Sequence, residues 1–262
     1  METIIAGRKQ LLEVSDVTVR YGGVTAVDSV SFDVAVGSLI GLIGPNGAGK
    51  TSLIDALTGY TPIDGGSIRF DDQELRGLPA YKRSRGGLAR TFQSVELFDD
   101  LTVEENLLVA SEGSGISKAL RDLFLPARKP DRSAVDWAMS ACGLEGLAKK
   151  HPNQISHGQR KLVGLARALA RRPKMLLLDE PAAGLDTDES AELGERLRAL
   201  PKDEGVTILL IDHDMGLVLS VSDRVYVLNF GRLISSGTPE HVRDDPAVIE
   251  AYLGRKELGG VD

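Results

Sequence analysis

Apolar and polar residues alternate along the first part of the chain, from residue 12 to residue 34. Alternation with a period of two is typical of a strand that buries one face. Gly22 and Gly23 divide this stretch into two halves, and a glycine pair often forms the turn between paired strands. The pattern therefore predicts two antiparallel strands joined at Gly22 and Gly23, with Tyr21 at their turn.

The pattern changes in the rest of the chain, where short apolar runs alternate with segments of helical periodicity. The apolar runs lie at 39–43, 67–70, 175–178, 206–211, 224–228 and 233–235, and the helical segments at 188–200 and 215–221. Strands that alternate with helices usually form a mostly parallel sheet with helices on its faces. Residues 101–172 are mainly helical in texture, with an inserted arm at 111–132 that mixes Gly, Ser, Lys and Pro. We therefore expect an α/β fold.

Composition narrows the class of protein. Hydrophobic residues make up 42% of the 262 residues, which is ample for a buried core. No apolar run approaches the ~18 to 20 residues that cross a bilayer, and residues 1–10 lack the features of an export signal, so a cytoplasmic location is expected. The net charge of −7 argues against a nucleic-acid partner, and the single Cys142 excludes an internal disulfide.

A glycine-rich loop follows the apolar run at 39–43 and precedes an apolar helical segment. The candidate ligand-binding residues are Gly44, Pro45, Asn46, Gly47, Ala48, Gly49, Lys50, Thr51 and Ser52. Its glycines let backbone N–H groups turn towards phosphate oxygens, and the helix that starts near Gly49 directs its positive end at the same charge. Lys50 adds a cation, and the Thr51 hydroxyl suits magnesium. A flexible glycine turn is the alternative, but the flanking strand and helix favour a nucleoside triphosphate site.

Two carboxylates, Asp179 and Glu180, come directly after the apolar run at 175–178. A strand buried on both faces tolerates charge only at its end, where ligand or water meets it. Because neighbouring side chains at a strand end point in different directions, we expect Asp179 to orient a magnesium shell and Glu180 to address an attacking water. The alternative is that this pair only caps the next helix.

A short polar segment precedes a run with apolar residues at helical spacing, 160–172. Its residues are Ser156, His157, Gly158 and Gln159, and we expect the helix to open at Gly158. Such a segment offers a hydroxyl, backbone N–H groups and a positive helix end to a phosphate. Taken alone, it is equally well a helix cap.

Together these segments resemble the motifs of ATP-binding cassette (ABC) ATPases, in the order of that family and over nearly the whole chain. The resemblance implies that Tyr21 stacks on adenine and that Gln93 reports the nucleotide state to a membrane partner. It also implies that Asp186 lies in the loop that crosses between two ATPases and that His213 touches the γ-phosphate. Each has an alternative: Tyr21 packing at a turn, Gln93 as a solvated side chain, and His213 as a core histidine.

The resemblance further implies a dimer, because the family's signature faces the nucleotide held by a second ATPase subunit. The residues that would act in trans are Ser156, His157, Gly158 and Gln159. His157 stands where the family has glycine, so its side chain must point away from the bound phosphate. ATP would close the dimer, and hydrolysis would open it by removing the bridging γ-phosphate.

The implied fold is a single P-loop NTPase domain of the ABC type over residues 1–262. Residues 11–92 and 174–238 would form the core, with a mixed or parallel central sheet and an antiparallel β subdomain. Residues 93–173 would form a helical subdomain that contains the signature, and 239–262 a helical tail.

The implied ligands are ATP and Mg²⁺. Thr51, Gln93 and, through water, Asp179 would hold the ion. The implied catalytic residues are Glu180, His213 and Gln93.

Among these ATPases, the chain most resembles the LivG-type subunit of branched-chain amino-acid importers, through residues 87–93, 179–185, 111–132 and 251–254. This resemblance implies two permease subunits, an extracytoplasmic solute-binding protein, and a homodimer or a heterodimer with a LivF-like ATPase, at the cytoplasmic face of the membrane. ATPases for urea or amide import or for lipopolysaccharide export are alternatives. A different class, soluble ABC-type ATPases without a membrane partner, usually carries a coiled coil or a second cassette, and this chain has one phosphate loop.

Overall fold

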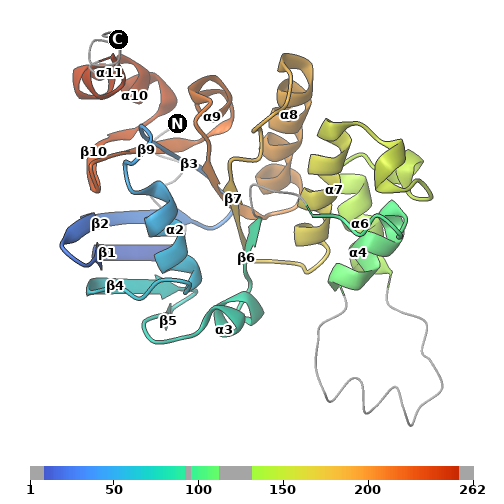
Figure 1. Cartoon of the computed structure of the whole chain (residues 1–262), viewed down its shortest axis with the longest axis horizontal. Helices are drawn as coiled ribbons and strands as arrows, with labels where there is room; N and C mark the ends of the chain where they lie inside the picture. The colour runs from blue at the N-terminus through green and yellow to red at the C-terminus, as the bar shows by residue number, and fades with distance from the viewer. Residues whose placement is uncertain (1–8, 92–95, 112–131, 254–262) are drawn as a thin grey trace. The chain divides into compact units, whose positions relative to one another are not determined.

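The computed structural model describes residues 9–91, 96–111 and 132–253 (Figure 1). The chain divides into two compact units. The first unit combines residues 1–93 with residues 174–262, and the second comprises residues 94–173.

The first unit contains a four-stranded antiparallel sheet with the strand order β2-β1-β4-β5. Its strands are β1 (Gln10–Tyr21), β2 (Val24–Ala35), β4 (Gly65–Phe70) and β5 (Gln73–Glu74). The predicted pair of antiparallel strands is confirmed, because Tyr21 pairs with Val24 across Gly22 and Gly23. Both strands bury valines in the core, and irregularities in the pairing of β1 with β2 interrupt the strict alternation, as between Val14 and Val17.

The same unit contains a six-stranded sheet with the order β10-β9-β3-β8-β7-β6. Its strands are β3 (Leu39–Ile43), β6 (Leu88–Thr91), β7 (Met175–Asp179), β8 (Thr207–Ile211), β9 (Arg224–Asn229) and β10 (Arg232–Gly237). Every pair is parallel except β10 with β9, so the prediction of a mostly parallel sheet is confirmed. All residues of β3 and β8 are buried, which explains their continuous apolar sequences. The strand β6 was not predicted, because Leu88 is its only buried residue.

Helix α2 (Lys50–Thr58) contributes Leu53, Ile54 and Leu57 to a core that also takes side chains from both sheets. Helices α8 (Thr187–Asp203) and α9 (Met215–Val221) contact β3. A Cβ atom on Gly41 would lie 2.4 Å from Cγ1 of Val218, so only glycine allows α9 to approach β3 this closely.

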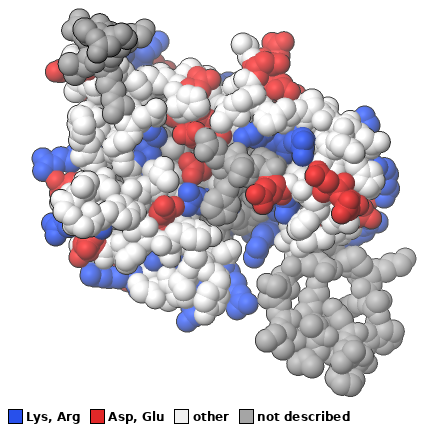
Figure 2. Space-filling view, viewed as in Figure 1, with Lys and Arg blue, Asp and Glu red and all other residues white. Residues whose placement is uncertain are grey.

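The described part of the first unit also contains the short helices α3 (Ala80–Arg85), α10 (Pro239–Asp244) and α11 (Pro246–Leu253). Acidic and basic side chains are interspersed over the described part of the face in Figure 2. In the part of the chain that the structure describes, no helix has both the length and the apolar character of a bilayer span.

The second unit packs α4 (Val103–Ser111), α6 (Ser133–Ala141) and α7 (His157–Leu169) together, with short 3₁₀ turns at Glu145–Leu147 and Pro152–Gln154. Asn106 is fully buried, and its amide donates to the carbonyl oxygens of Phe98, Leu101 and Thr102. The predicted arm at 111–132 lies outside the described residues except for its two ends. Helix α7 begins at His157, one residue before the predicted start at Gly158.

Candidate active site

The predicted phosphate loop joins β3 to α2. Two of its glycines are required by close backbone contacts: a Cβ atom on Gly44 would lie 2.1 Å from the Leu228 carbonyl oxygen, and one on Gly49 would lie 2.3 Å from that of Ala26. Gly49 has a φ of 103° and precedes α2 without a capping side chain. The first N–H groups of α2 are therefore placed to meet an anion rather than a side-chain cap.

Lys50 is buried within this loop. Its Nζ donates to the carbonyl oxygen of Gly44 at 2.6 Å and to that of Pro45 at 3.1 Å. These bonds bring the ammonium group back across the loop, and Lys50 also lines the cavity that opens there.

A cavity of about 390 Å³ opens at the loop. It is lined by Val24, Thr25, Ala26, Asn46, Gly47, Ala48, Gly49, Lys50, Thr51, Ser52, Glu180, Phe230 and Gly231. The structure thus brings Glu180 into one cavity with Lys50 and Thr51, although well over 100 residues separate them along the sequence.

Glu180 directly follows β7 and adopts a φ of 49°, which is unusual for a residue with a side chain. Its backbone N–H donates to the carbonyl oxygen of Ile211 at 2.7 Å, which ties it to the end of β8. His213 follows β8, and its Nδ1 lies 3.8 Å from Oε2 of Glu180. Two neighbouring parallel strands thus bring a carboxylate and an exposed imidazole to the same end of the sheet.

Asp212 is a supporting residue that sequence analysis did not single out. Its side chain is fully buried, Oδ2 accepts from the Ala182 N–H at 3.1 Å, and Oδ1 accepts from the Asp214 N–H at 3.0 Å. It therefore fixes the turn after Glu180 and the turn that carries His213. A carboxylate at the end of the apolar strand β8 was the available signal, the same one that marked Asp179.

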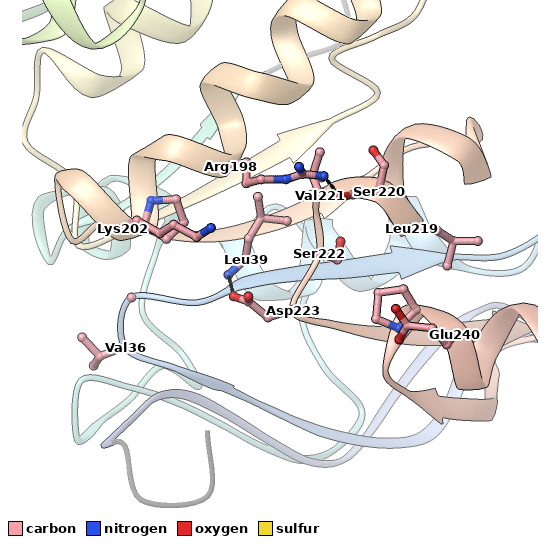
Figure 3. A pocket seen from close by; sticks show the side chains of 13 residues that line it. Val36, Leu39, Arg198, Lys202, Leu219, Ser220, Val221, Ser222, Asp223 and Glu240 are labelled. Carbon is pink, nitrogen blue, oxygen red and sulfur yellow. Dashed lines mark hydrogen bonds between the residues drawn. The ribbon is translucent and has the colours of Figure 1, made fainter. Parts of the chain in front are cut away.

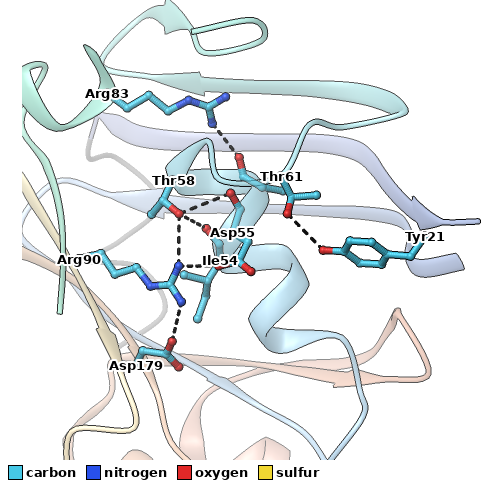
Figure 4. Close-up of polar contacts among 9 residues, drawn as sticks. Tyr21, Ile54, Asp55, Thr58, Thr61, Arg83, Arg90 and Asp179 are labelled. Atoms are coloured by element: carbon cyan, nitrogen blue, oxygen red, sulfur yellow. Dashed lines mark hydrogen bonds and ion pairs between the residues drawn. The ribbon is translucent and has the colours of Figure 1, made fainter. Parts of the chain in front are cut away.

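Asp179 is held by Arg90, a second residue that sequence analysis did not assign to the site (Figure 4). Nη2 of Arg90 lies 2.8 Å from Oδ2 of Asp179, and Nη1 lies 2.5 Å from Oδ1 of Asp55 on α2. Arg90 comes from the unpredicted strand β6, which explains why it was missed. It links the end of β7 to the helix that follows the phosphate loop.

Two predicted residues cap helices. Asp186 caps α8 by accepting from the Glu189 N–H at 2.9 Å, so the hypothesis that Asp179 and Glu180 cap this helix is wrong. Ser156 caps α7 by accepting from the Gln159 N–H at 3.2 Å, and the Gln159 side chain accepts from the Ser156 N–H at 3.0 Å. His157 is exposed, whereas Gly158 is buried.

Tyr21 is half exposed at the end of β1, and its hydroxyl lies 3.2 Å from Oγ1 of Thr61 (Figure 4). It is absent from the described lining of the cavity, which begins three residues later at Val24. Gln93 lies outside the described residues.

Comparison with known proteins assigns the family. The family profile described as "ABC transporter" matches residues 27–183, more than half of the chain. The chain belongs to the ABC transporter family. It is therefore an ATPase subunit of such a transporter, with the α/β fold expected for the family. A second profile, "Branched-chain amino acid ATP-binding cassette transporter", matches residues 232–257 of this ABC ATPase.

Two relatives and one solved structure show the extent of the similarity. The ABC ATPase is 43% identical to BraF of Pseudomonas aeruginosa, over 94% of this chain and 98% of BraF. It is 42% identical to LivG of Escherichia coli, over 93% of this chain and 98% of LivG. It resembles the crystal structure of an ATP-binding cassette of an ABC transporter in its ADP conformation, with a TM-score of 0.81 at 30% identity over 94% and 99% of the two chains.

A second, larger cavity of about 570 Å³ in this ABC ATPase lies at the start of β3, away from the phosphate loop (Figure 3). Two of its polar groups serve the fold: Oδ2 of Asp223 accepts from the Leu39 N–H at 2.9 Å, and Arg198 donates to the Ser220 carbonyl oxygen. It contains none of the predicted ATP-site residues, so size alone does not identify the active site.

Proposed function

We propose that this ABC ATPase binds and hydrolyses ATP to power the import of branched-chain amino acids. BraF and LivG are named as high-affinity branched-chain amino acid transport ATP-binding proteins, and the similarity extends over nearly their whole lengths. The profile match at residues 232–257 supports the same solute class. The placement of Glu180 in the cavity of the phosphate loop carries the enzymatic part of the proposal.

In the proposed reaction, Glu180 takes a proton from the water that attacks the γ-phosphate, and His213 contacts that phosphate. A base of this kind must lie beside the phosphate it serves, which agrees with the shared cavity of Glu180, Lys50 and Thr51. The loop N–H groups and Lys50 bind the phosphate chain, while Asp212 keeps the His213 turn in place. Tyr21 stacks on the adenine.

Thr51 and Asp179 offer oxygen donors of the kind that a magnesium ion requires. Thr51 is exposed in the cavity, and Asp179 offers a carboxylate at the end of β7. Mg²⁺ prefers such oxygen donors and retains several of its waters. We assign the ion to Thr51, Gln93 and, through water, Asp179; when bound, it offsets the negative charge of the triphosphate.

We further propose that the two units form one ATPase domain that works as a dimer, with a second copy or with a LivF-like ATPase. The Ser156 to Gln159 segment serves the nucleotide of the other subunit, and the Asp186 loop crosses between the subunits. Two permease subunits hold the dimer at the cytoplasmic face of the membrane, and an extracytoplasmic binding protein delivers the solute. Gln93 transmits the nucleotide state to the permeases.

Uptake of radiolabelled leucine, isoleucine and valine tests the proposal in cells from which this gene is deleted. Deletion should abolish high-affinity uptake, and the wild-type chain and the control Glu195→Gln, an exposed residue of α8, should restore it. Glu180→Gln should not restore uptake. Unchanged uptake of all three amino acids after deletion would refute the solute assignment, and full restoration by Glu180→Gln would refute the role of Glu180.

A further inference from the structure

The cavity at the phosphate loop has an apolar side as well as a polar side. Val24 and Phe230 both line it, although they are 66% and 77% exposed. Lys50, Thr51 and Glu180 supply the polar side. A nucleotide has the same division, with a charged phosphate chain at one end and a flat, weakly polar base at the other.

Phe230 lies in the turn between β9 and β10 and adopts a φ of 46°. A bulky residue with positive φ is an outlier that persists only where the surrounding structure holds it. The two-residue turn accounts for the positive φ, because Phe230 and Gly231 both have positive φ, as in a type I′ hairpin turn. Exposure of a phenylalanine side chain brings no stability from burial, so the folding of the turn does not explain why its ring is exposed.

The turn is fixed against the phosphate loop by its neighbours. The Gly231 N–H donates to the Ala48 carbonyl oxygen at 2.8 Å, and the Gly231 carbonyl oxygen accepts from the Asp28 N–H at 2.8 Å. Nη2 of Arg232 lies 2.6 Å from Oδ2 of Asp28. These contacts fix the backbone of the turn beside the loop, so Phe230 is placed at the cavity before any ligand arrives.

We propose that Phe230 contributes an aromatic contact to the nucleoside part of ATP, in addition to the stacking expected of Tyr21. This inference rests on the proposed function, because it assumes that the cavity binds ATP. Stacking between an aromatic side chain and a base is tolerant of the base's hydrogen-bonding pattern, so Phe230 adds affinity for nucleotides rather than selectivity for adenine.

Calorimetric titration of the full chain with Mg²⁺-ATP and with Mg²⁺-tripolyphosphate, which lacks the nucleoside, tests the contact. Phe230→Ala should weaken ATP binding roughly 5- to 30-fold and leave tripolyphosphate binding unchanged. Tyr81→Ala, which removes an exposed ring on α3 outside the cavity, should change neither affinity. Wild-type affinity for ATP in Phe230→Ala would overturn the proposal, and so would equal weakening for both ligands, because the turn would then only support the loop.

A second variant gives a direct optical readout. Phe230→Trp adds a tryptophan to the single one of the wild-type chain, Trp137. ATP should quench the added fluorescence and tripolyphosphate should not; no quenching by saturating ATP would overturn the proposal. A wild-type chain that binds no ATP would instead refute the proposed function, so the two failures are distinguishable.

Discussion

Arg90 and Asp179 form a partly buried ion pair in which Nη2 of the guanidinium lies 2.8 Å from Oδ2 of the carboxylate. The Arg90 side chain is only 9% exposed and also contacts Asp55 on α2. Burial lowers the pKa of Arg90, but the contacts with Asp55 and Asp179 outweigh it and raise the pKa above its usual value. The guanidinium therefore stays charged and couples the helix after the phosphate loop to the end of β7.

Arg90→Met should lower the free energy of unfolding by about 1 to 3 kcal/mol, because it leaves two partly buried carboxylates without their shared cation. Urea denaturation measures the loss. Arg69→Met is the matched control, since Arg69 is exposed and its guanidinium donates to the Asp72 carbonyl oxygen at 3.3 Å. In a double-mutant cycle, additive effects of Arg90→Met and Asp55→Asn on the free energy of unfolding would refute the coupling between these two side chains.

Glu180→Gln should keep ATP binding but lower turnover by roughly 10²- to 10⁴-fold, because the amide cannot accept a proton from the attacking water. With ATP, the variant should accumulate as a stable dimer, which size-exclusion chromatography with light scattering detects. Glu195→Gln serves as the control for loss of a surface carboxylate. A Glu180→Gln chain that stays monomeric with ATP and every companion ATPase would contradict the dimer mechanism.

Asp212→Ala should destabilise the chain by about 1 to 3 kcal/mol and lower ATP turnover, because two N–H groups lose the acceptor that fixes the Glu180 and His213 turns. Chemical denaturation and phosphate release measure the two effects. Asp212→Asn keeps one acceptor oxygen and should fall between the wild type and Asp212→Ala. Wild-type turnover in Asp212→Ala would show that this carboxylate does not position the site.

Because of Tyr252 on α11, we expect the stability of the protein to change with pH in the alkaline range. Its hydroxyl is buried, and burial raises the pKa of this phenol from about 10 to about 12, against a smaller opposing effect of the Gly44 backbone. Because the pKa is raised in the folded state, the protonated phenol contributes fully to the free energy of unfolding below pH 10. This contribution is lost as the pH rises towards 12.

Tyr252→Phe should therefore match the wild type at pH 7 and become more stable than it between pH 10 and pH 12. Because the side chain is partly exposed, the gain should be about 1 to 2 kcal/mol rather than the full value of the shift. Urea denaturation of both proteins across this range isolates the effect. A difference in stability that does not change with pH would contradict it.

Local sequence patterns sufficed for the buried strands β3 and β8 and for the phosphate loop. The apolar residues of β3 and β8 are contiguous, and Gly44 and Gly49 lie within six residues of Lys50. Each of these patterns can therefore be recognised within a short stretch of sequence. The carboxylates at the end of β7 were visible for the same reason, since charge directly after a buried strand stands out.

The residues that surround the site and hold it in place could not be predicted from local patterns. Arg90 lies 35 residues from Asp55 and 89 from Asp179, and its strand β6 has no apolar run to reveal it. Phe230 reaches the cavity because β9 is paired with β3, which no local pattern specifies. Tertiary pairing thus determines which other residues surround the loop, whereas local sequence patterns show the loop and the carboxylates at the end of β7.

Phosphate release from Mg²⁺-ATP by the purified chain, assembled with its permease and ATPase partners in liposomes, tests the central claim most directly. The account predicts saturable release that Lys50→Ala abolishes and that Lys82→Ala, on the exposed surface of α3, leaves unchanged. An assembled wild-type complex that neither retains nor cleaves ATP would contradict the account.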